Sequence, residues 1–383
     1  MKFSIDKKEL QGALEIIKQV IPKKVIPKKV IQPIFIEASD GMLHLRASSI
    51  DTEASVLIPA NISKEGTCCC DSVICELVSK FVDGRMDFNL AKTLTISQEV
   101  ADVATKRKHR IAISEHDNFP NKIEIEKYTQ SDAKMFDGFV KAAGSLSFED
   151  PAMNVLGCFH IEPDFIITGN KFRASLYENI NVNSSVVNVP GNILMTAISN
   201  LLSGSNKNVT EYCFGDRSAI RQTIYDNNDT MKFQWEIMIN TVIDDFPIVI
   251  KGTIQELKDS KFKLKLICNK YKLGEVLEIC ELYHNIALGQ GLASHVILEN
   301  KNKNITLLMD IPETGSMIEP LECEIDGDDF SIAIDPKMLK KSLSFVSSNV
   351  VELRFFDSRK PLILLDGEDG DFTYLQMPMV MPL

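Results

Sequence analysis

The chain has 383 residues, of which 44% are hydrophobic and 25% charged, and its formal net charge is −11. This length predicts two or three domains rather than one. The acidic balance argues against a protein that holds nucleic acid by overall charge attraction, although a local basic surface remains compatible with it. No apolar run is long enough to span a membrane, and the start of the chain lacks the apolar stretch of a signal peptide. Nine cysteines without a secretion signal then predict a reducing, cytoplasmic location.

Six segments along the chain share one pattern: a short apolar strand, a capping residue, and a helix with apolar residues three and four positions apart. The predicted caps, in chain order, are Asp6, Asp71, Ser131, Pro190 with Gly191, Asn269 and Asp335. Asp335 gives the clearest start, because Pro336 follows it at the first helical position. Alternating runs such as residues 350–355 predict about three strands between helices. The chain therefore reads as six βαβββ units.

Two Phe-Pro pairs, Phe119-Pro120 and Phe246-Pro247, each close a run of strands. The polar segments that follow them, 121–130 and 251–260, are predicted to be connectors. The six units then pair into three similar domains, 1–126, 127–256 and 257–383. The predicted fold class is α+β, with the helices of each domain packed on its sheets.

Motifs of the common enzyme classes are missing from the sequence, including a glycine-rich phosphate loop, Gly-x-Ser-x-Gly and His-Glu-x-x-His. Cys68, Cys69 and Cys70 would alternate across a strand and could not converge on one ion. Segment 366–371 is rich in carboxylates but lacks the closing carboxylate of an EF-hand, and it fits a hairpin turn. We therefore expect no catalytic residue, no metal and no cofactor.

Four features together are typical of one family. Residues 1–3 open directly into a capped helix, and the two Phe-Pro pairs end strand runs. Segment 168–174 is similar to Thr-Asp-Gly-His-Arg-Leu-Ala, and segment 374–379 is similar to Tyr-x-x-Met-Pro-Met. With these features the chain resembles the bacterial DNA polymerase III beta subunit, the sliding clamp of replication. Lys171-Phe172 and the residues after Met379 depart from the family pattern, which indicates a divergent member of bacterial or phage origin.

The resemblance implies a ring with helices on its inner wall and sheets outside, which tethers a DNA polymerase to double-stranded DNA without catalysis of its own. Helices packed about 8–10 Å apart would enclose too narrow a hole if there were six, whereas twelve leave roughly 28 Å, enough for a duplex. We therefore expect a head-to-tail homodimer. The alternative is a clamp-fold scaffold or a transcription-coupled clamp that does not serve replication.

Charged residues form the first two predicted sites. The family has a DNA-contacting loop where this chain has Lys23, Lys24, Lys28 and Lys29, although a solvated loop would explain each lysine equally well. The resemblance also implies that two subunit edges meet with opposite charge. The residues predicted there are Lys106, Arg107, Lys108 and Arg110 on one side and Glu313, Glu319 and Glu322 on the other. The alternative is that both sets are solvated strand faces.

The third predicted site is a cleft between the second and third domains, which in the family binds short peptides of the polymerase and the clamp loader. Its residues, carried over by position, are Val155, Thr168, Lys171, Phe172, Arg173, Pro247, Leu292, Met338, Leu362, Leu375, Met377, Pro378 and Met379. Methionine suits a surface that accepts several peptides, because its side chain is flexible and polarisable. Without the resemblance, Met377 and Met379 would be interpreted as the end of a core strand.

Overall fold

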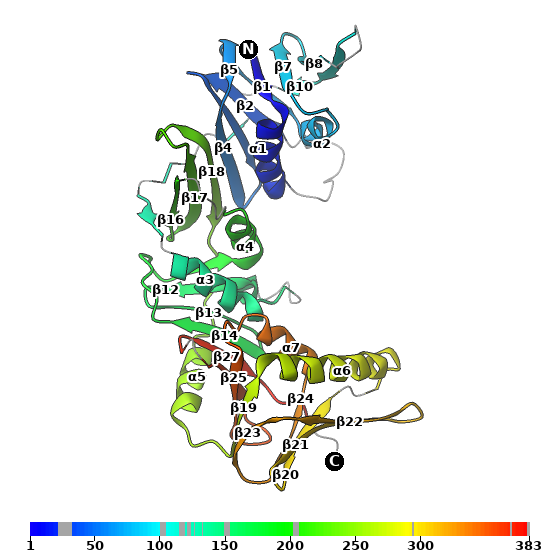
Figure 1. Cartoon of the computed structure of the whole chain (residues 1–383). Coiled ribbons are helices and arrows are strands. Elements are labelled where there is room, and N and C mark those ends of the chain that lie inside the picture. The colour runs from blue at the N-terminus through cyan, green and yellow to red at the C-terminus, as the bar shows by residue number, and fades with distance from the viewer. Residues whose placement is uncertain are drawn as a thin grey trace. The chain divides into compact units, whose positions relative to one another are not determined.

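The computed structural model describes residues 1–21, 33–99, 105–114, 119–120, 124–125, 127–131, 133–148, 154–201, 207–292, 295–367 and 370–380. These residues form two compact units (Figure 1). Unit 1 comprises Met1–Ser131 and Asn192–Thr241, and unit 2 comprises Asp132–Gly191 and Val242–Leu383.

Unit 1 is built on two sheets. Its strands are β1 (Lys2–Asp6), β2 (Pro33–Ser39), β3 (Met42–Ser48), β4 (Thr52–Pro59), β5 (Asn61–Lys64), β6 (Gly66–Asp71), β7 (Arg85–Leu90), β8 (Leu94–Gln98), β9 (Arg107–Ile111), β10 (Ile113–Ser114), β11 (Thr129–Gln130), β16 (Lys207–Cys213), β17 (Arg217–Tyr225) and β18 (Met231–Asn240). The five-stranded sheet has the order β5-β1-β7-β8-β9, and the nine-stranded sheet has the order β10-β6-β2-β3-β4-β18-β17-β16-β11. The helices are α1 (Lys7–Val20), α2 (Val73–Ser79) and α4 (Gly191–Ser199), which begins at the boundary between the units.

The first two helices lie side by side, and α1 covers β3 and β4 (Figure 1). The Asp6 carboxylate accepts a hydrogen bond of 2.8 Å from the Lys8 amide, so the predicted cap is confirmed. The apolar face of α1 is buried as its spacing predicted, and burying each large aliphatic side chain contributes about 2 kcal/mol. In α2 the N-cap is Ser72, one residue after the predicted Asp71. The Asp71 carboxylate still accepts a hydrogen bond of 2.8 Å from the amide of Val73, the first residue of the helix.

Unit 2 also has two sheets. Its strands are β12 (Cys158–Glu162), β13 (Phe165–Gly169), β14 (Arg173–Glu178), β15 (Val187–Pro190), β19 (Leu264–Asn269), β20 (Val296–Lys301), β21 (Asn304–Ile311), β22 (Gly315–Leu321), β23 (Cys323–Gly327), β24 (Phe330–Ile334), β25 (Val350–Phe355), β26 (Leu362–Asp366) and β27 (Phe372–Gln376). The nine-stranded sheet has the order β15-β12-β13-β14-β27-β26-β25-β19-β23, and the four-stranded sheet has the order β22-β21-β20-β24. The helices are α3 (Ala133–Ala142), α5 (Val249–Asp259), α6 (Lys270–Gly289), α7 (Pro336–Leu343) and the 3₁₀ turns η2 (Ala143–Ser145) and η3 (Asn154–Gly157).

Both faces of the nine-stranded sheet in unit 2 are covered by helices. The α3 helix packs on β13, β14 and β27, and α7 packs on β27. On the opposite face, Ile254 and Leu257 of α5 join a buried cluster with Leu375 of β27. The prediction of a connector over 251–260 is therefore wrong. A stripe of Ile250, Ile254 and Leu257 at helical spacing lies within that polar segment and forms an amphipathic helix.

Two further caps agree with the sequence. Asn269 accepts from the amides of Tyr271 and Lys272 at 3.0 and 3.2 Å, and Asp335 accepts from the Met338 amide at 3.0 Å. Ser131 donates its hydroxyl to the Thr210 carbonyl at 3.1 Å and lies next to the β11–β16 pair. The residue between Ser131 and α3 lies outside the described residues, so the cap at Ser131 stays a prediction. The α6 helix has 20 residues.

The α+β fold class is confirmed, with seven α-helices and four sheets among the described residues. Each nine-stranded sheet joins strands from two of the three predicted domains, through β4 beside β18 and through β14 beside β27. The three-domain division stays a prediction. No described helix is long and apolar enough to cross a membrane. Within the described ranges, no three His, Cys, Asp or Glu side chains gather as they would around a metal ion.

Candidate functional site: two sheet edges and a C-terminal tail

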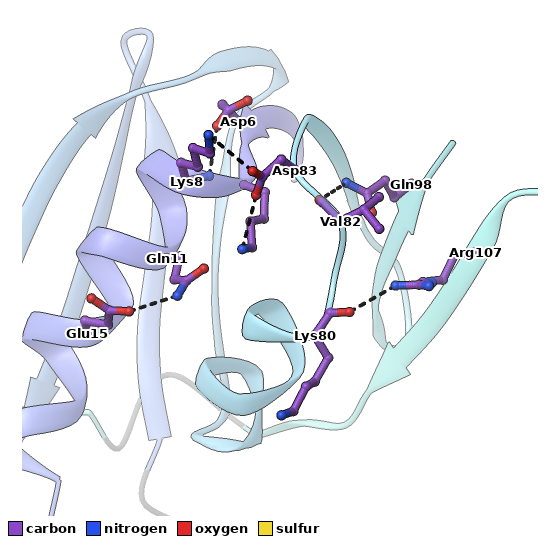
Figure 2. Close-up of polar contacts among 10 residues, drawn as sticks. Asp6, Lys8, Gln11, Glu15, Lys80, Val82, Asp83, Gln98 and Arg107 are labelled. Atoms are coloured by element: carbon purple, nitrogen blue, oxygen red, sulfur yellow. Dashed lines mark hydrogen bonds and ion pairs between the residues drawn. The ribbon is translucent and has the colours of Figure 1, made fainter. Parts of the chain in front are cut away.

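The last strand of the five-stranded sheet, β9, carries most of the predicted basic edge. Arg107 Nη1 donates to the Lys80 carbonyl at 3.1 Å, and its guanidinium lies 5.4 Å from the centre of the Phe81 ring. On β8, Gln98 Nε2 donates to the Val82 carbonyl at 2.8 Å (Figure 2). These contacts fix β8 and β9 against the segment that follows α2. The other two predicted cations of β9, Lys108 and Arg110, are exposed.

Lysines pair with carboxylates near this edge. Lys106 Nζ lies 2.7 Å from a Glu99 oxygen, and hydrogen bonding to Glu99 raises the pKa of Lys106. Lys7 and Lys8 at the start of α1 both contact Asp83, at 3.4 and 3.2 Å, and the hydrogen bond from Lys8 lowers the pKa of Asp83 (Figure 2). Of the four predicted edge cations, Lys106 therefore already has a partner in its own chain.

The predicted acidic edge lies at β22, the last strand of the four-stranded sheet. Ile318 is 68% exposed on this strand, Glu319 is half-buried, and Pro320 lacks the amide hydrogen that a further strand could use. Glu313 occupies a positive φ of 64° in the turn before β22. Glu322, just after the strand, pairs with Lys272 of α6, and that hydrogen bond lowers the pKa of Glu322. Glu313 and Glu319 are thus the acids that flank or occupy the edge.

The segment after β27 is tied down at two points. The Met377 amide donates to the Phe172 carbonyl at 2.7 Å, and the Met379 amide donates to the Ala333 carbonyl of β24 at 2.9 Å. Phe172 is 57% exposed and Met377 is 37% exposed, so two large apolar side chains face solvent beside each other's backbone. Phe172, Met377, Pro378 and Met379 are called the tail surface below.

The turn before β14 presents this surface. The Asn170 side-chain oxygen accepts hydrogen bonds from the amides of Phe172 and Arg173 at 2.9 and 3.0 Å. The Asn170 amide in turn donates to the Arg173 carbonyl at 2.8 Å. Asn170 therefore closes the turn and holds Lys171 and Phe172 outward, where both are exposed.

Comparison with known proteins gives matches along the whole chain. Residues 260–380 match the family model described as DNA polymerase III beta subunit, C-terminal domain. The chain is 22% identical over 369 residues to the beta sliding clamp of Streptomyces coelicolor, covering 90% of each chain. It covers 100% of the DNA polymerase III beta subunit of Thermotoga maritima, and is itself covered in full, with a TM-score of 0.80 and 19% identity. The DNA polymerase sliding clamp of Bacillus subtilis gives a TM-score of 0.81 and 17% identity, again over 100% of both chains.

These relatives share one fold. The predicted resemblance to the bacterial beta sliding clamps is confirmed. The beta clamp fold accounts for the full length of the chain, and Met377, Pro378 and Met379 of the tail surface lie in the part that matches the family model.

Within the beta clamp fold, the predicted peptide-binding residues separate onto two faces of the nine-stranded sheet of unit 2. Val155 and Leu375 belong to the buried cluster on the α5 face, together with Phe246, which precedes the half-buried Pro247. Leu292 follows α6 and is 37% exposed, and it is not among the described side chains that pack on this cluster.

The other face carries polar members of the set. The Thr168 hydroxyl donates to the Ala142 carbonyl of α3 at 2.5 Å, and the Tyr374 hydroxyl donates to the Met338 carbonyl of α7 at 3.4 Å. Leu362 is fully buried opposite Gln376. Arg173 also pairs with Gln376, so its side chain lies on this same face.

Two lysines of α7, Lys337 and Lys341, lie near Arg173, and the sequence interpretation did not connect them with Arg173. Burial lowers the pKa of Lys341, and the charges of Arg173 and Lys337 lower it further. Arg173 Nε is buried and has no hydrogen-bond partner among the described residues. Lys337 and Lys341 are four positions apart on α7, and this spacing is the signal that could have placed them together. Lys23, Lys24, Lys28 and Lys29 lie outside the described residues.

Proposed function

We propose that this chain is a DNA sliding clamp, of which two copies close head to tail around double-stranded DNA. The full-length match to beta clamps supports this proposal, and the observation that carries it further is the pair of open sheet edges. Edge β9 is basic and edge β22 is acidic and partly apolar. The proposal assigns the protein a tethering role and no chemical step.

Pairing of β9 in one copy with β22 in the next would satisfy the backbone hydrogen-bonding groups of both edges. An open edge presents unpaired amides and carbonyls, which a strand from another chain can pair with. Joining the five-stranded sheet of one copy to the four-stranded sheet of the next would make a nine-stranded sheet, equal in size to the two within each chain. Because β9 and β22 are different surfaces, the contact is head to tail, and two such contacts close a ring.

The tail surface would recruit the polymerase and the clamp loader through short peptides. An exposed aromatic ring and an exposed methionine offer adaptable apolar contact, and the two backbone hydrogen bonds hold the tail in place before a peptide arrives. The cations around Arg173 would complement acidic groups beside the apolar peptide residues.

Topological retention on DNA tests the proposal. The protein is loaded onto nicked circular DNA by the loader of its own genome, and the bound fraction is isolated by gel filtration. We expect retention at high salt and release when the circle is cut once, because a ring slides off an end without breaking a contact. Binding that is unchanged by linearisation would overturn the proposal and favour a clamp-fold scaffold.

Peptide binding tests the tail surface separately. The double variant Phe172→Ala with Met377→Ala should bind a fluorescent Gln-x-x-Leu-Phe peptide at least about tenfold more weakly, since a few buried aromatic and apolar contacts dominate such interfaces. The matched control is Leu288→Ala, which removes a side chain that is 52% exposed on α6. Equal affinity for both variants would remove the tail surface from the proposal.

A further inference from the structure

Two cysteines of unit 2 face each other across neighbouring strands. Cys268 lies in β19, Cys323 opens β23, and the two residues are direct partners in the antiparallel register. Both are free thiols, and β23 is the outermost strand of its nine-stranded sheet. Neither thiol belongs to the predicted edges or to the tail surface, so the proposed clamp function does not depend on this pair.

Cys268 and Cys323 occupy the type of position in an antiparallel strand pair at which opposing side chains lie closest together. The Asp328 amide donates to the Lys263 carbonyl at 3.3 Å, which makes that position a hydrogen-bonded pair. Hydrogen-bonded and non-hydrogen-bonded pairs alternate along an antiparallel ladder. Counting five positions along the register makes Cys268 and Cys323 a non-hydrogen-bonded pair. Its Cα atoms are then about 4.5 Å apart, within the range that a disulfide spans.

The two thiols differ in access and in acidity. Cys268 is 1% exposed, whereas Cys323 is half-buried at the sheet edge. The hydrogen bond from Cys268 lowers the pKa of Cys323, because it stabilises the thiolate. By contrast, burial raises the pKa of Cys158 and of Cys280 to about 12. The thiolate is the reactive form of cysteine, so Cys323 combines access with reactivity.

We propose that Cys268 and Cys323 form a redox modification site that a peroxide converts into a cross-strand disulfide and a thiol reverses. The Cys323 thiolate attacks one oxygen of hydrogen peroxide and the O–O bond breaks. Cys323 becomes a sulfenic acid, and the second peroxide oxygen takes up a proton and leaves as water. The Cys268 thiol then attacks the Cys323 sulfur and the S–O bond breaks. The departing hydroxide takes up the proton that Cys268 releases and leaves as a second water. In total two thiols and one hydrogen peroxide give one disulfide and two waters.

The disulfide would staple the edge strand β23 to β19. Edge strands open more readily than central ones, because they have a paired neighbour on one side only. A covalent link at the first residue of β23 holds the end that follows β22 and therefore limits local opening there. This inference is independent of DNA encirclement, since it depends on one strand pair within a single copy.

Mass spectrometry of the intact full-length protein tests the site. The protein is treated with hydrogen peroxide, its remaining thiols are blocked, and its peptides are mapped without reduction. We expect one cross-linked pair containing Cys268 and Cys323, and a thiol count after unfolding that falls from nine to seven. Dithiothreitol should restore all nine thiols. A Cys323 that remains reduced, or that links to another cysteine, would overturn the proposal.

Variants separate the two roles. In Cys268→Ala the disulfide is lost, and Cys323 also loses the hydrogen bond that lowers its pKa, so it oxidises more slowly and stops at a sulfenic acid that dimedone traps. Cys323→Ala leaves Cys268 unmodified. The matched control is Cys213→Ala, which removes a half-buried cysteine whose pKa is raised by burial and should leave the cross-link unchanged. Equal peroxide reactivity of Cys213 and Cys323 in the wild-type protein would contradict the assignment, and this comparison needs no variant to fold.

Discussion

The strand pairs inside the nine-stranded sheets differ in their side chains from the edge strands of the two shorter sheets. At the junction of β4 and β18, Trp235 pairs with Val56, and both are 1% exposed or less. At the junction of β14 and β27, Ala174 pairs with Leu375 in a buried cluster. By contrast, β9 ends its sheet with the exposed cations Lys108 and Arg110, and β22 ends its sheet with an exposed Ile318, a half-buried Glu319 and Pro320. The internal junctions are therefore buried and apolar, whereas the two edge strands carry charged residues, a proline and an exposed isoleucine.

Charged residues at the edge of a sheet limit which strands can pair with that edge. An unguarded apolar edge would pair with any available strand, whereas charged residues and Pro320 discourage pairing with all but a complementary partner. The basic residues of β9 and the acidic residues near β22 are complementary to each other. The comparison therefore predicts that changes at the internal junctions affect folding, while changes at the edges affect assembly.

The largest expected effect follows from removing Trp235. Its side chain is fully buried at the β4–β18 junction, so Trp235→Ala should lower the free energy of unfolding by about 3–5 kcal/mol. Urea unfolding followed by circular dichroism measures this change. The matched control is Ile318→Ala on β22, which is 68% exposed and should change stability by about 0.5 kcal/mol or less. A loss below about 1 kcal/mol for Trp235→Ala would contradict the expectation that the internal junctions, and not the edges, determine stability.

The second effect concerns assembly. The double change Lys108→Glu with Arg110→Glu places acidic groups on β9 opposite the acidic residues near β22. Like charges brought together at an interface cost several kcal/mol. The dissociation constant of the proposed dimer should therefore rise by about a hundredfold. Sedimentation velocity measures the dimer fraction, and urea unfolding should show little change. Added salt should weaken the wild-type dimer, because it screens exposed charges.

A complementary change provides the control for this prediction. Glu313→Lys with Glu319→Lys on a second copy should restore one contact when the two variants are mixed, since the reversed edges are again opposite in charge. Dimerisation that is unaffected by either double variant would show that the edges do not meet, and the sheet edges would then be solvated faces.

Local signals made part of the fold predictable. The caps at Asp6, Asn269 and Asp335 were found because a cap depends on residues only two or three positions away. The α5 helix was missed because its three buried residues are diluted by polar neighbours, and their burial depends on a distant strand. The strand pairs β4–β18 and β14–β27 join residues far apart in sequence, and periodicity does not encode such partners.

The tail surface was predicted from a short motif, and the structure adds what the motif could not contain. The family resemblance placed Val155, Thr168 and Arg173 in one set, but strand alternation and packing put Val155 on the α5 face and the other two on the opposite face. The cations of α7 near Arg173 depend on how that helix docks on β27, which is a tertiary contact.

The smallest expected effect concerns an ionic contact at the β14–β27 junction. The Asp371 carboxylate contacts Lys134 Nζ at 2.8 Å and accepts from Asn179 Nδ2 at 2.6 Å. Burial alone would raise the pKa of Asp371, but the hydrogen bonds from Lys134 and Asn179 outweigh it and lower the pKa. A carboxyl group with a lowered folded pKa stabilises the protein above its unfolded pKa of about 3.9, and this contribution is lost as pH falls through the folded value.

Asp371→Asn should therefore lower the free energy of unfolding at pH 7 by less than about 1 kcal/mol, because the contact is largely exposed to solvent screening. The difference between wild type and variant should shrink as the pH falls from about 4 through the lower folded pKa, since the unfolded carboxyl is protonated first and the folded carboxylate only at lower pH. Unfolding midpoints in urea across this pH range measure it. A difference that stays constant with pH would mean that shape rather than charge matters at this contact. In either case the effect is smaller than that of Trp235→Ala, because the internal junctions depend chiefly on buried apolar area.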